Sequence, residues 1–292
     1  MKTTHHSEYL KLSSVFIKPV ENAFVSNEVI NDQWFNLNYL SKPDFELAIK
    51  EYEVFRNCLN NEKIKLIHFP LDKGLKIDSI YCRDASIATN YGMIICNMGK
   101  AGRKNEPRSQ RQFYEENDML VLGEIKSPGT LEGGDVAWID ESTLAVGHTY
   151  RTNEDGILQL KGLLEPKGIE IIVVELPHYK GNSDVFHLMS IFSPVDKDLA
   201  VIYSALMPIK FRNELIKRGF KFVEVSDDEF ESMACNVLAL APRKCLIVEG
   251  NPKTQNKLLK AGCIVSTYEG ENISLKGGGG PTCLTRPIIR TY

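Results

Sequence analysis

Apolar and polar residues follow one another along this chain in a repeated order of element types. The clearest example lies in residues 136–175, where two short apolar runs precede a helical pattern and a β-branched run. Asn153 is suited to cap the start of the helix, and Gly168 is suited to end it. The predicted strand, strand, helix and strand are Val136–Ile139, Thr143–Gly147, Asn153–Glu165 and Ile169–Leu176.

The same order recurs on both sides of this stretch. It is predicted over residues 84–123, 186–225 and 235–267, and the second of these sets begins with a strand over Phe186–Phe192. The N-terminal part is looser and is predicted to lack one strand, which a segment near the end of the chain could supply. Its strand, helix, strand and completing strand are Ser14–Ile17, Asp44–Cys58, Ile64–Phe69 and Thr285–Arg290.

Five such modules arranged in a ring would close like a propeller, with helices outside and a central channel. The sequence therefore predicts an α/β fold, a five-bladed pseudo-symmetric α/β propeller of ββαβ modules. Sequence identity between the modules is low, so a generic α/β protein is the alternative. In a propeller, functional residues are expected at the strand ends and loops at one end of the channel.

Composition narrows the possible classes of protein. Hydrophobic residues are 43% and charged residues 25%, as in ordinary globular proteins, and 35 Lys and Arg against 38 Asp and Glu argue against nucleic-acid binding. The sequence has no apolar run of the roughly 20 residues that a membrane helix needs. The start of the chain shows no secretory pattern, and seven sparse cysteines favour a reducing, cytoplasmic setting. We expect a single domain over residues 1–292, with residues 1–12 as a disordered tail.

One glycine-rich loop near the end of the chain could display a reactive side chain. Four glycines, Gly277–Gly280, precede Pro281 and Cys283, so few side chains would crowd a ligand that approaches the thiol. A buried cysteine at a strand start is the alternative for Cys283. Five other cysteines lie among apolar residues and are expected to fill the core, while Cys82 is ambiguous.

Other candidate residues each have an ordinary structural explanation. His187 lies in an apolar run and could be a core histidine, with His148 as its competitor for a chemical role. Glu132 and Asp135 flank two glycines, which favours a turn but could also point a carboxylate into a cavity. Cysteine or histidine pairs at zinc-ligand spacing do not occur in the sequence, so a metal site is not expected.

Taken together, these residues resemble the guanidine-modifying superfamily of arginine deiminases, amidinotransferases and dimethylarginine dimethylaminohydrolases. The resemblance covers about Ser13–Arg290 and implies the same five-bladed α/β propeller. The residues that carry it are Arg83-Asp84, Glu132-Gly-Gly-Asp135, His187 and Gly277-Gly-Gly-Gly-Pro-Thr-Cys283.

The resemblance implies a role for each of these positions. Cys283 matches the nucleophile, His187 the general acid and base, and Glu132 and Asp84 the carboxylates that hold a guanidinium group. The further substrate-binding positions that it suggests are Asp78, Asp135, Arg151 for the substrate carboxylate, and Arg103 as a second such arginine, for which Arg108 is the alternative.

Two departures bear on the choice within the superfamily. Deiminases and amidinotransferases typically have a carboxylate two residues after the histidine, where this chain has Met189, and this favours the dimethylaminohydrolases. The run Gly278–Pro281 before the cysteine is more like the deiminases. The expected activity is hydrolysis of a methylated arginine to citrulline and an amine, through a covalent S-alkylthiouronium. Deimination, amidino transfer to an amine, and a catalytically silent ligand-binding propeller are the alternatives.

This chemistry requires no cofactor and no metal ion. The expected partner is a small guanidino substrate, with no nucleic acid and no membrane, and a homodimer is left open. In an amidinotransferase, a lid would control entry of the acceptor amine, and the segment Asn22–Trp34 is the candidate for it.

Overall fold

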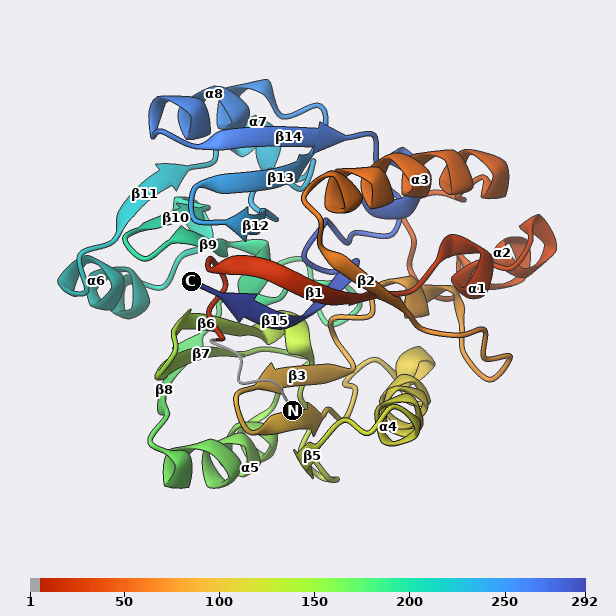
Figure 1. Ribbon diagram of the computed structural model, residues 1–292, viewed down its shortest axis with the longest axis horizontal. Helices are drawn as coiled ribbons and strands as arrows, with labels where there is room; N and C mark the ends of the chain where they lie inside the picture. Colours follow the sequence, from red (N-terminus) through yellow and green to blue (C-terminus); the bar gives the residue numbers. More distant parts are fainter. Residues whose placement is uncertain (1–5) are drawn as a thin grey trace.

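The computed structural model describes residues 6–292, which form five three-stranded sheets around a central axis (Figure 1). In every sheet the innermost strand is antiparallel to the middle strand, and the middle strand is parallel to the outer one. This confirms the predicted five-bladed α/β propeller. From the inner to the outer strand, the sheets are β15 (Thr285–Thr291), β1 (Lys11–Ile17) and β2 (Lys65–His68); β3 (Ser86–Thr89), β4 (Gly92–Ile95) and β5 (Val121–Glu124); β6 (Val136–Asp140), β7 (Thr143–His148) and β8 (Glu170–Glu175); β9 (Phe192–Asp196), β10 (Leu199–Ile202) and β11 (Lys221–Glu224); and β12 (Leu238–Ala241), β13 (Lys244–Val248) and β14 (Ile264–Tyr268).

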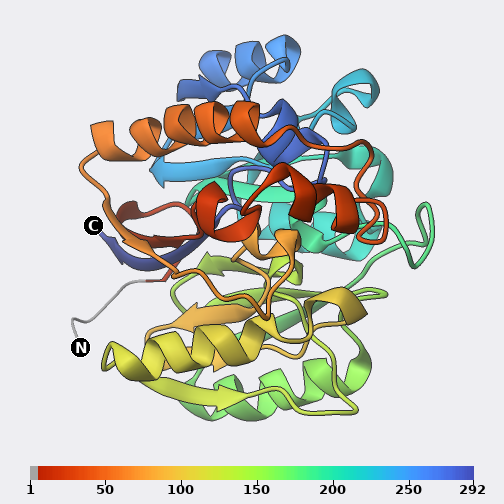
Figure 2. The same cartoon turned by 90° about the vertical axis from the view of Figure 1, so that its right-hand side faces the viewer.

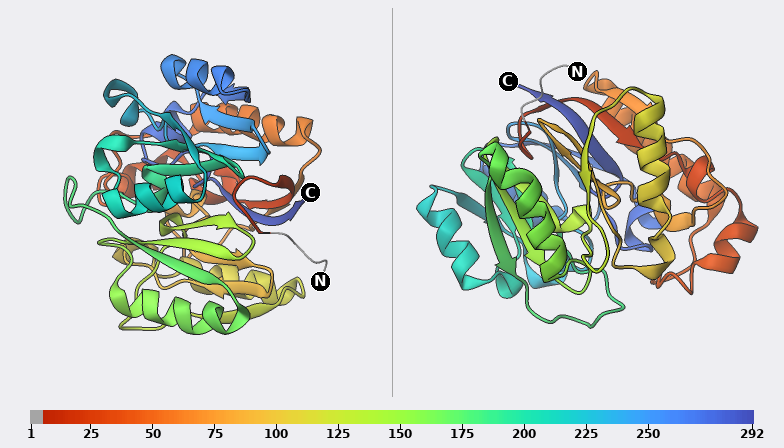
Figure 3. Two further views of the ribbon diagram at one scale, coloured as in Figure 1. Left: turned by 90° about the vertical axis from the view of Figure 1, so that its left-hand side faces the viewer. Right: turned by 90° about the horizontal axis from the view of Figure 1, so that it is seen from below.

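A helix connects the middle and outer strands of each sheet, because two parallel neighbours need a crossover connection. These helices lie on the outside of the ring (Figures 1 and 3). They are α3 (Phe45–Asn61), α4 (Glu106–Glu116), α5 (Glu154–Leu164), α6 (Ile209–Lys217) and α8 (Pro252–Lys260), and the shorter helices are α1 (Val20–Ala23), α2 (Asn27–Gln33) and α7 (Asp227–Phe230). In α5 the predicted cap is present, since Asn153 Oδ1 accepts a hydrogen bond from Gly156 N at 2.9 Å.

Both ends of the described chain meet in one sheet. The last strand, β15, pairs antiparallel with β1, and Lys11 lies opposite Thr291. The expected contribution of the C-terminal segment to the first module is therefore confirmed. The ring is closed by hydrogen bonds between the two ends of the chain rather than by a continuous loop.

The predicted strand over Phe186–Phe192 is wrong, because β9 begins only at Phe192. A short 3₁₀ turn, Leu188–Ser190, precedes it. Side chains accept from the backbone N–H groups that a strand would use: Ser190 Oγ accepts from His187 N at 3.1 Å, and Asp135 Oδ1 accepts from Leu188 N at 3.0 Å. One local and one distant side-chain acceptor therefore hold this segment in a turn despite its apolar pattern.

The predicted tail is also wrong where the structure describes it; residues 1–5 lie outside the described part. Residues 6–10 are inserted among the inner strands and are mostly buried. The His6 ring stacks on Trp138 with ring centres 6.2 Å apart, and Glu8 Oε1 accepts from Arg83 Nη2 at 2.7 Å. Arg83 and Glu8 are almost completely buried, so this segment is an integral part of the interior. Among residues 6–292, no helix combines the length and the apolar character needed to cross a bilayer.

Candidate active site

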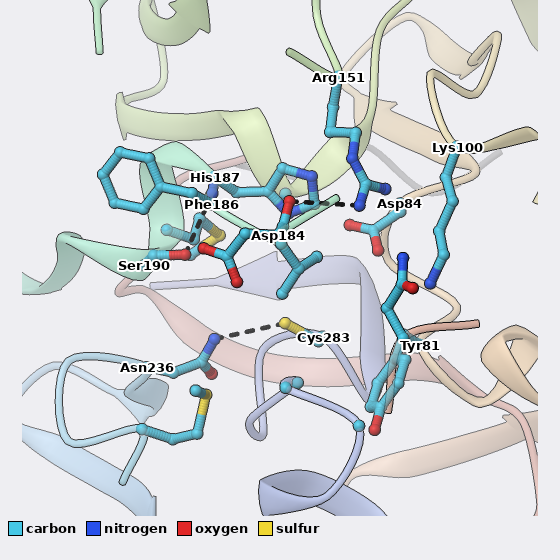
Figure 4. Close-up of a pocket in the computed structure, with 18 of the residues that line it drawn as sticks. Tyr81, Asp84, Lys100, Arg151, Asp184, Phe186, His187, Ser190, Asn236 and Cys283 are labelled. Atoms are coloured by element: carbon cyan, nitrogen blue, oxygen red, sulfur yellow. Dashed lines mark hydrogen bonds between the residues drawn. The ribbon is translucent and has the colours of Figure 1, made fainter. Parts of the chain in front are cut away.

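A pocket lies where the loops that lead into the inner strands converge (Figure 4). Each of the five sheets contributes one polar side chain just before its inner strand begins. These side chains are Asp84 before β3, Glu132 before β6, His187 before β9, Asn236 before β12 and Cys283 before β15. Four of them line the pocket, whereas Glu132 is fully buried behind its wall. The pseudo-symmetry of the ring thus brings together, at one end of the ring, residues that are far apart in sequence.

Cys283 lies in the pocket wall with its thiol held by polar neighbours. Asn236 Nδ2 donates to Cys283 Sγ at 3.3 Å, and Thr282 Oγ1 lies 3.8 Å from the same sulfur. Burial, followed by the nearby carboxylate of Asp84, raises the pKa of the Cys283 thiol, while the hydrogen bonds and the positive charge of Arg83 act in the opposite direction. Cys283 is therefore mainly a neutral thiol near neutral pH.

The glycines around the site are required by close packing. A Cβ atom at Gly134 would lie 2.3 Å from His187 Nδ1 and 2.8 Å from Asp84 Oδ1. A Cβ atom at Gly279 would lie 2.5 Å from the Tyr81 ring. Both glycine motifs found in the sequence therefore allow backbone to approach functional side chains.

His187 is buried and interacts directly with Glu132. Their atoms Nε2 and Oε2 are 2.9 Å apart. Burial alone would lower the pKa of His187, but the carboxylates of Asp135, Glu132 and Asp84 outweigh it and raise the pKa to about 9. Burial acts to raise the pKa of Glu132, yet the hydrogen bond with His187 and the positive charges around it lower this pKa. The pair is thus an imidazolium and a carboxylate at neutral pH.

The acidic residues of the site already have cationic neighbours. Arg103 Nη1 contacts Asp84 Oδ2, Lys100 Nζ lies 2.6 Å from Asp78 Oδ2, and Arg151 Nη1 lies 3.5 Å from Glu132 Oε2. The second oxygen of Asp84, Oδ1, is buried and has no hydrogen-bond partner among the described residues. Such an oxygen at a pocket wall is suited to accept from a cationic ligand, because an unpaired buried acceptor is costly.

The predicted substrate-binding residues occupy different places. Arg151, Asp78 and Arg103 line the pocket. The guanidinium of Arg103 donates to Asp84, to Glu106 and to the Tyr81 carbonyl, so its donors are largely occupied. Arg108 is an exposed residue of α4 that is not among those lining the pocket.

Asp135 lies behind the pocket and not in its wall. Its oxygens accept hydrogen bonds from Thr149 Oγ1, Thr152 Oγ1 and Leu188 N, at 2.7, 2.7 and 3.0 Å. It thereby ties the turn after His187 to the loop after β7. Direct contact of Asp135 with a substrate stays a prediction, but this geometry gives it a positioning role.

Sequence reasoning did not assign roles to three residues of the pocket. Lys100 pairs with Asp78, Asn236 donates to the thiol, and Asp184 extends a carboxylate into the pocket (Figure 4). The sequence around these residues gives no local pattern that indicates a role. The residues that Asn236 and Asp184 contact, Cys283 and Arg151, lie far from them along the chain. The candidate lid over residues 22–34 contains α2, and the neighbouring residues Leu37, Asn38 and Leu40 line the pocket in its place.

One group of side chains has the composition of a metal site. Ligand atoms of Asp84, Glu132 and His187 all lie within 4.8 Å of one another. The guanidinium groups of Arg103 and Arg151 already contact these two carboxylates. Both carboxylates therefore already have a cationic partner, and the acceptor left without one among the described residues is Asp84 Oδ1.

Comparisons with known proteins agree with this geometry. A family model described as "N,N dimethylarginine dimethylhydrolase, eukaryotic" matches residues 21–290. The N(G),N(G)-dimethylarginine dimethylaminohydrolase of Pseudomonas aeruginosa is 23% identical over 248 residues, which cover 85% of this chain and 91% of that protein.

Solved structures show the same fold. The N-terminal domain of ArgZ, an arginine dihydrolase from cyanobacteria, superposes with a TM-score of 0.80 at 18% identity, covering 95% of this chain and 98% of that domain. The amidinotransferase SxtG of Microseira wollei superposes with a TM-score of 0.79 at 14% identity, covering 99% of this chain and 98% of that one.

Proposed function

Because the chain belongs to the N,N-dimethylarginine dimethylhydrolase family, we propose that it hydrolyses a guanidino amino acid, an N-substituted arginine, to citrulline and an amine. The observation that carries this proposal is that Cys283, His187 and the unpaired oxygen of Asp84 face one pocket. A thiol, a charged imidazole and a free acceptor are the groups that cleavage of a guanidinium requires.

Binding of the substrate would prepare the nucleophile. Asp84 Oδ1 accepts from the planar guanidinium, and Glu132 lies next to His187 on the neighbouring side of the site. A bound cation beside Cys283 lowers the pKa of the thiol, because an opposite charge favours the thiolate. Asn236 Nδ2 donates to the sulfur and stabilises that thiolate, while Thr282 Oγ1 donates to Asn236 Oδ1 and holds the amide in place. The substrate thus converts an inert thiol into the attacking group.

His187 would then act first as an acid and later as a base. The thiolate adds to the guanidinium carbon, and imidazolium His187 gives its proton to the departing amine as the C–N bond breaks. A cationic S-alkylthiouronium remains on Cys283. Neutral His187 takes a proton from water, and the resulting hydroxide adds to the same carbon. The C–S bond then breaks as the added hydroxyl gives its proton to solvent, which releases citrulline and the thiolate and leaves His187 protonated for the next turnover.

A panel of guanidines tests this function. We expect the purified protein to release a ureido product and one equivalent of amine from mono- or dimethylated arginine, and less from arginine, agmatine or guanidinoacetate. Cys283→Ser should lose turnover while keeping its circular-dichroism spectrum. Equal citrulline release by Cys283→Ser, or formation of a new guanidine in place of the ureido product when an acceptor amine is present, would contradict the proposed hydrolysis.

A further inference from the structure

A long loop between β8 and β9 contributes one wall of the pocket. It protrudes from the ring (Figures 2 and 3), and its residues Tyr179–Lys180 and Ser183–His187 line the pocket. No regular element lies within residues 176–187. Position and rigidity of this wall therefore depend on side-chain contacts with neighbouring parts of the chain.

Several hydrogen bonds hold the loop in place. Glu231, at the end of α7, accepts from Tyr179 Oη at 2.5 Å and from Lys180 Nζ at 2.6 Å. Asn38 Nδ2 donates to the Ser183 carbonyl at 3.3 Å. These contacts fix the loop on both sides of the pocket mouth, directly before Asp184.

Asp184 has an unusual environment among the acidic residues of this pocket. Its carbonyl oxygen accepts from Arg151 Nη2 at 3.4 Å, which places the residue next to that guanidinium. Its side chain points into the pocket (Figure 4) and is half-buried. The carboxylate forms no hydrogen bond or ion pair with any residue of the described chain, whereas Asp78 and Asp84 are both paired with cations.

The two ends of an extended guanidino amino acid differ in the charges they carry. The guanidinium end matches Asp84 Oδ1, which is buried beside His187 and Cys283. The other end carries a carboxylate and an ammonium on one carbon atom. A neighbouring arginine and carboxylate are complementary to that pair of charges, and Arg151 and Asp184 are such neighbours.

We propose that Asp184 binds the α-ammonium group of the substrate while Arg151 binds its α-carboxylate. The inference rests on the proposed function and makes it more specific. It restricts the substrate class to guanidino α-amino acids with a free amino group. Guanidino acids that lack this group, and arginines acylated on it, would bind poorly.

Binding to an inactive protein tests the inference separately from turnover. In Cys283→Ser, calorimetry would compare arginine with 5-guanidinopentanoate, which differs only in lacking the α-amino group. Adding Asp184→Asn should weaken arginine binding about 10- to 100-fold, as expected for loss of a charged hydrogen bond. Binding of the deamino compound should change less than about twofold, because that compound has no ammonium to lose.

A matched control removes a carboxylate elsewhere. Asp32 is an exposed residue of α2 that does not line the pocket, so Asp32→Asn should leave both affinities unchanged. Equal losses for the two ligands in Asp184→Asn would show that Asp184 binds the guanidinium or orients Arg151, and would overturn the inference. Unchanged binding of arginine in Asp184→Asn would also overturn the inference, and so would equal affinity of Cys283→Ser for both ligands. These outcomes would leave the proposed function intact if the parent enzyme still releases citrulline from a methylated arginine.

Discussion

The ion pair between Glu132 and His187 is one of the interactions that keep the proposed general acid protonated. Glu132→Gln removes the negative charge 2.9 Å from His187 Nε2 and keeps the size of the side chain. A hydrogen bond to a charged group contributes about 1.5–3 kcal/mol, and one pKa unit corresponds to about 1.4 kcal/mol. Starting from the raised pKa of about 9, we expect Glu132→Gln to lower the pKa of His187 by about 1–2 units.

Titration followed by NMR of ¹⁵N-labelled histidine measures this pKa directly. The chain has six histidines, and the resonance missing from His187→Gln identifies the right one. Glu154→Gln, at the exposed start of α5, is a control that should leave the titration unchanged. A parent pKa near 6.5, or the same pKa in Glu132→Gln, would refute the electrostatic reasoning.

The same change should appear in catalysis. Departure of the amine needs protonated His187, so activity should fall as the pH rises through the His187 pKa. In the parent this alkaline limb of kcat/KM is expected near the raised pKa of about 9, because kcat/KM reports the pKa values of the free enzyme. In Glu132→Gln it should move down by the amount that NMR reports. Agreement between the two shifts would identify His187 as the titrating acid.

Three further predictions follow from the geometry. Gly134→Ala would push a methyl group to 2.3 Å from His187 Nδ1, and turnover should fall by more than about 10²-fold, whereas Gly162→Ala, which has no atoms nearby, should keep full activity. Glu8→Gln removes the ion-pair partner of buried Arg83, and urea unfolding should show that the free energy of unfolding falls by about 3–5 kcal/mol; a fall below about 1 kcal/mol would contradict this. Arg151→Ala should raise KM for substrates with a free carboxylate and leave agmatine turnover unaffected, so equal effects on both would remove its assigned role.

Local patterns predicted much of the fold. The helix expected over Asn153–Glu165 agrees closely with α5 (Glu154–Leu164), and Asn153 caps it as expected. These features depend on residues within a few positions of one another. The segment around His187 was mispredicted because its backbone donors bond to Ser190 and to Asp135, and Asp135 lies 53 positions from Leu188.

Within the interior and the site, too, some features could be predicted from the sequence and others could not. Glycine-rich stretches and the order of motifs marked Cys283, His187, Glu132 and Asp84 in the sequence. The pairing of Glu8 with Arg83 spans 75 positions, and no local pattern indicates it. Asp184 and Arg151 likewise become neighbours only when the ring has formed. Their proposed joint role in binding the substrate could therefore not be predicted from the sequence.

Closure of the ring by β1 and β15 has a consequence for how activity appears during synthesis and folding. Cys283 lies two positions before β15, which is held by pairing with the first strand. Such a contact between distant segments forms late, because its loop-closure entropy is large. During synthesis, the other blades can therefore fold before β15 pairs with β1. The active site around Cys283 is then completed in a late step of folding.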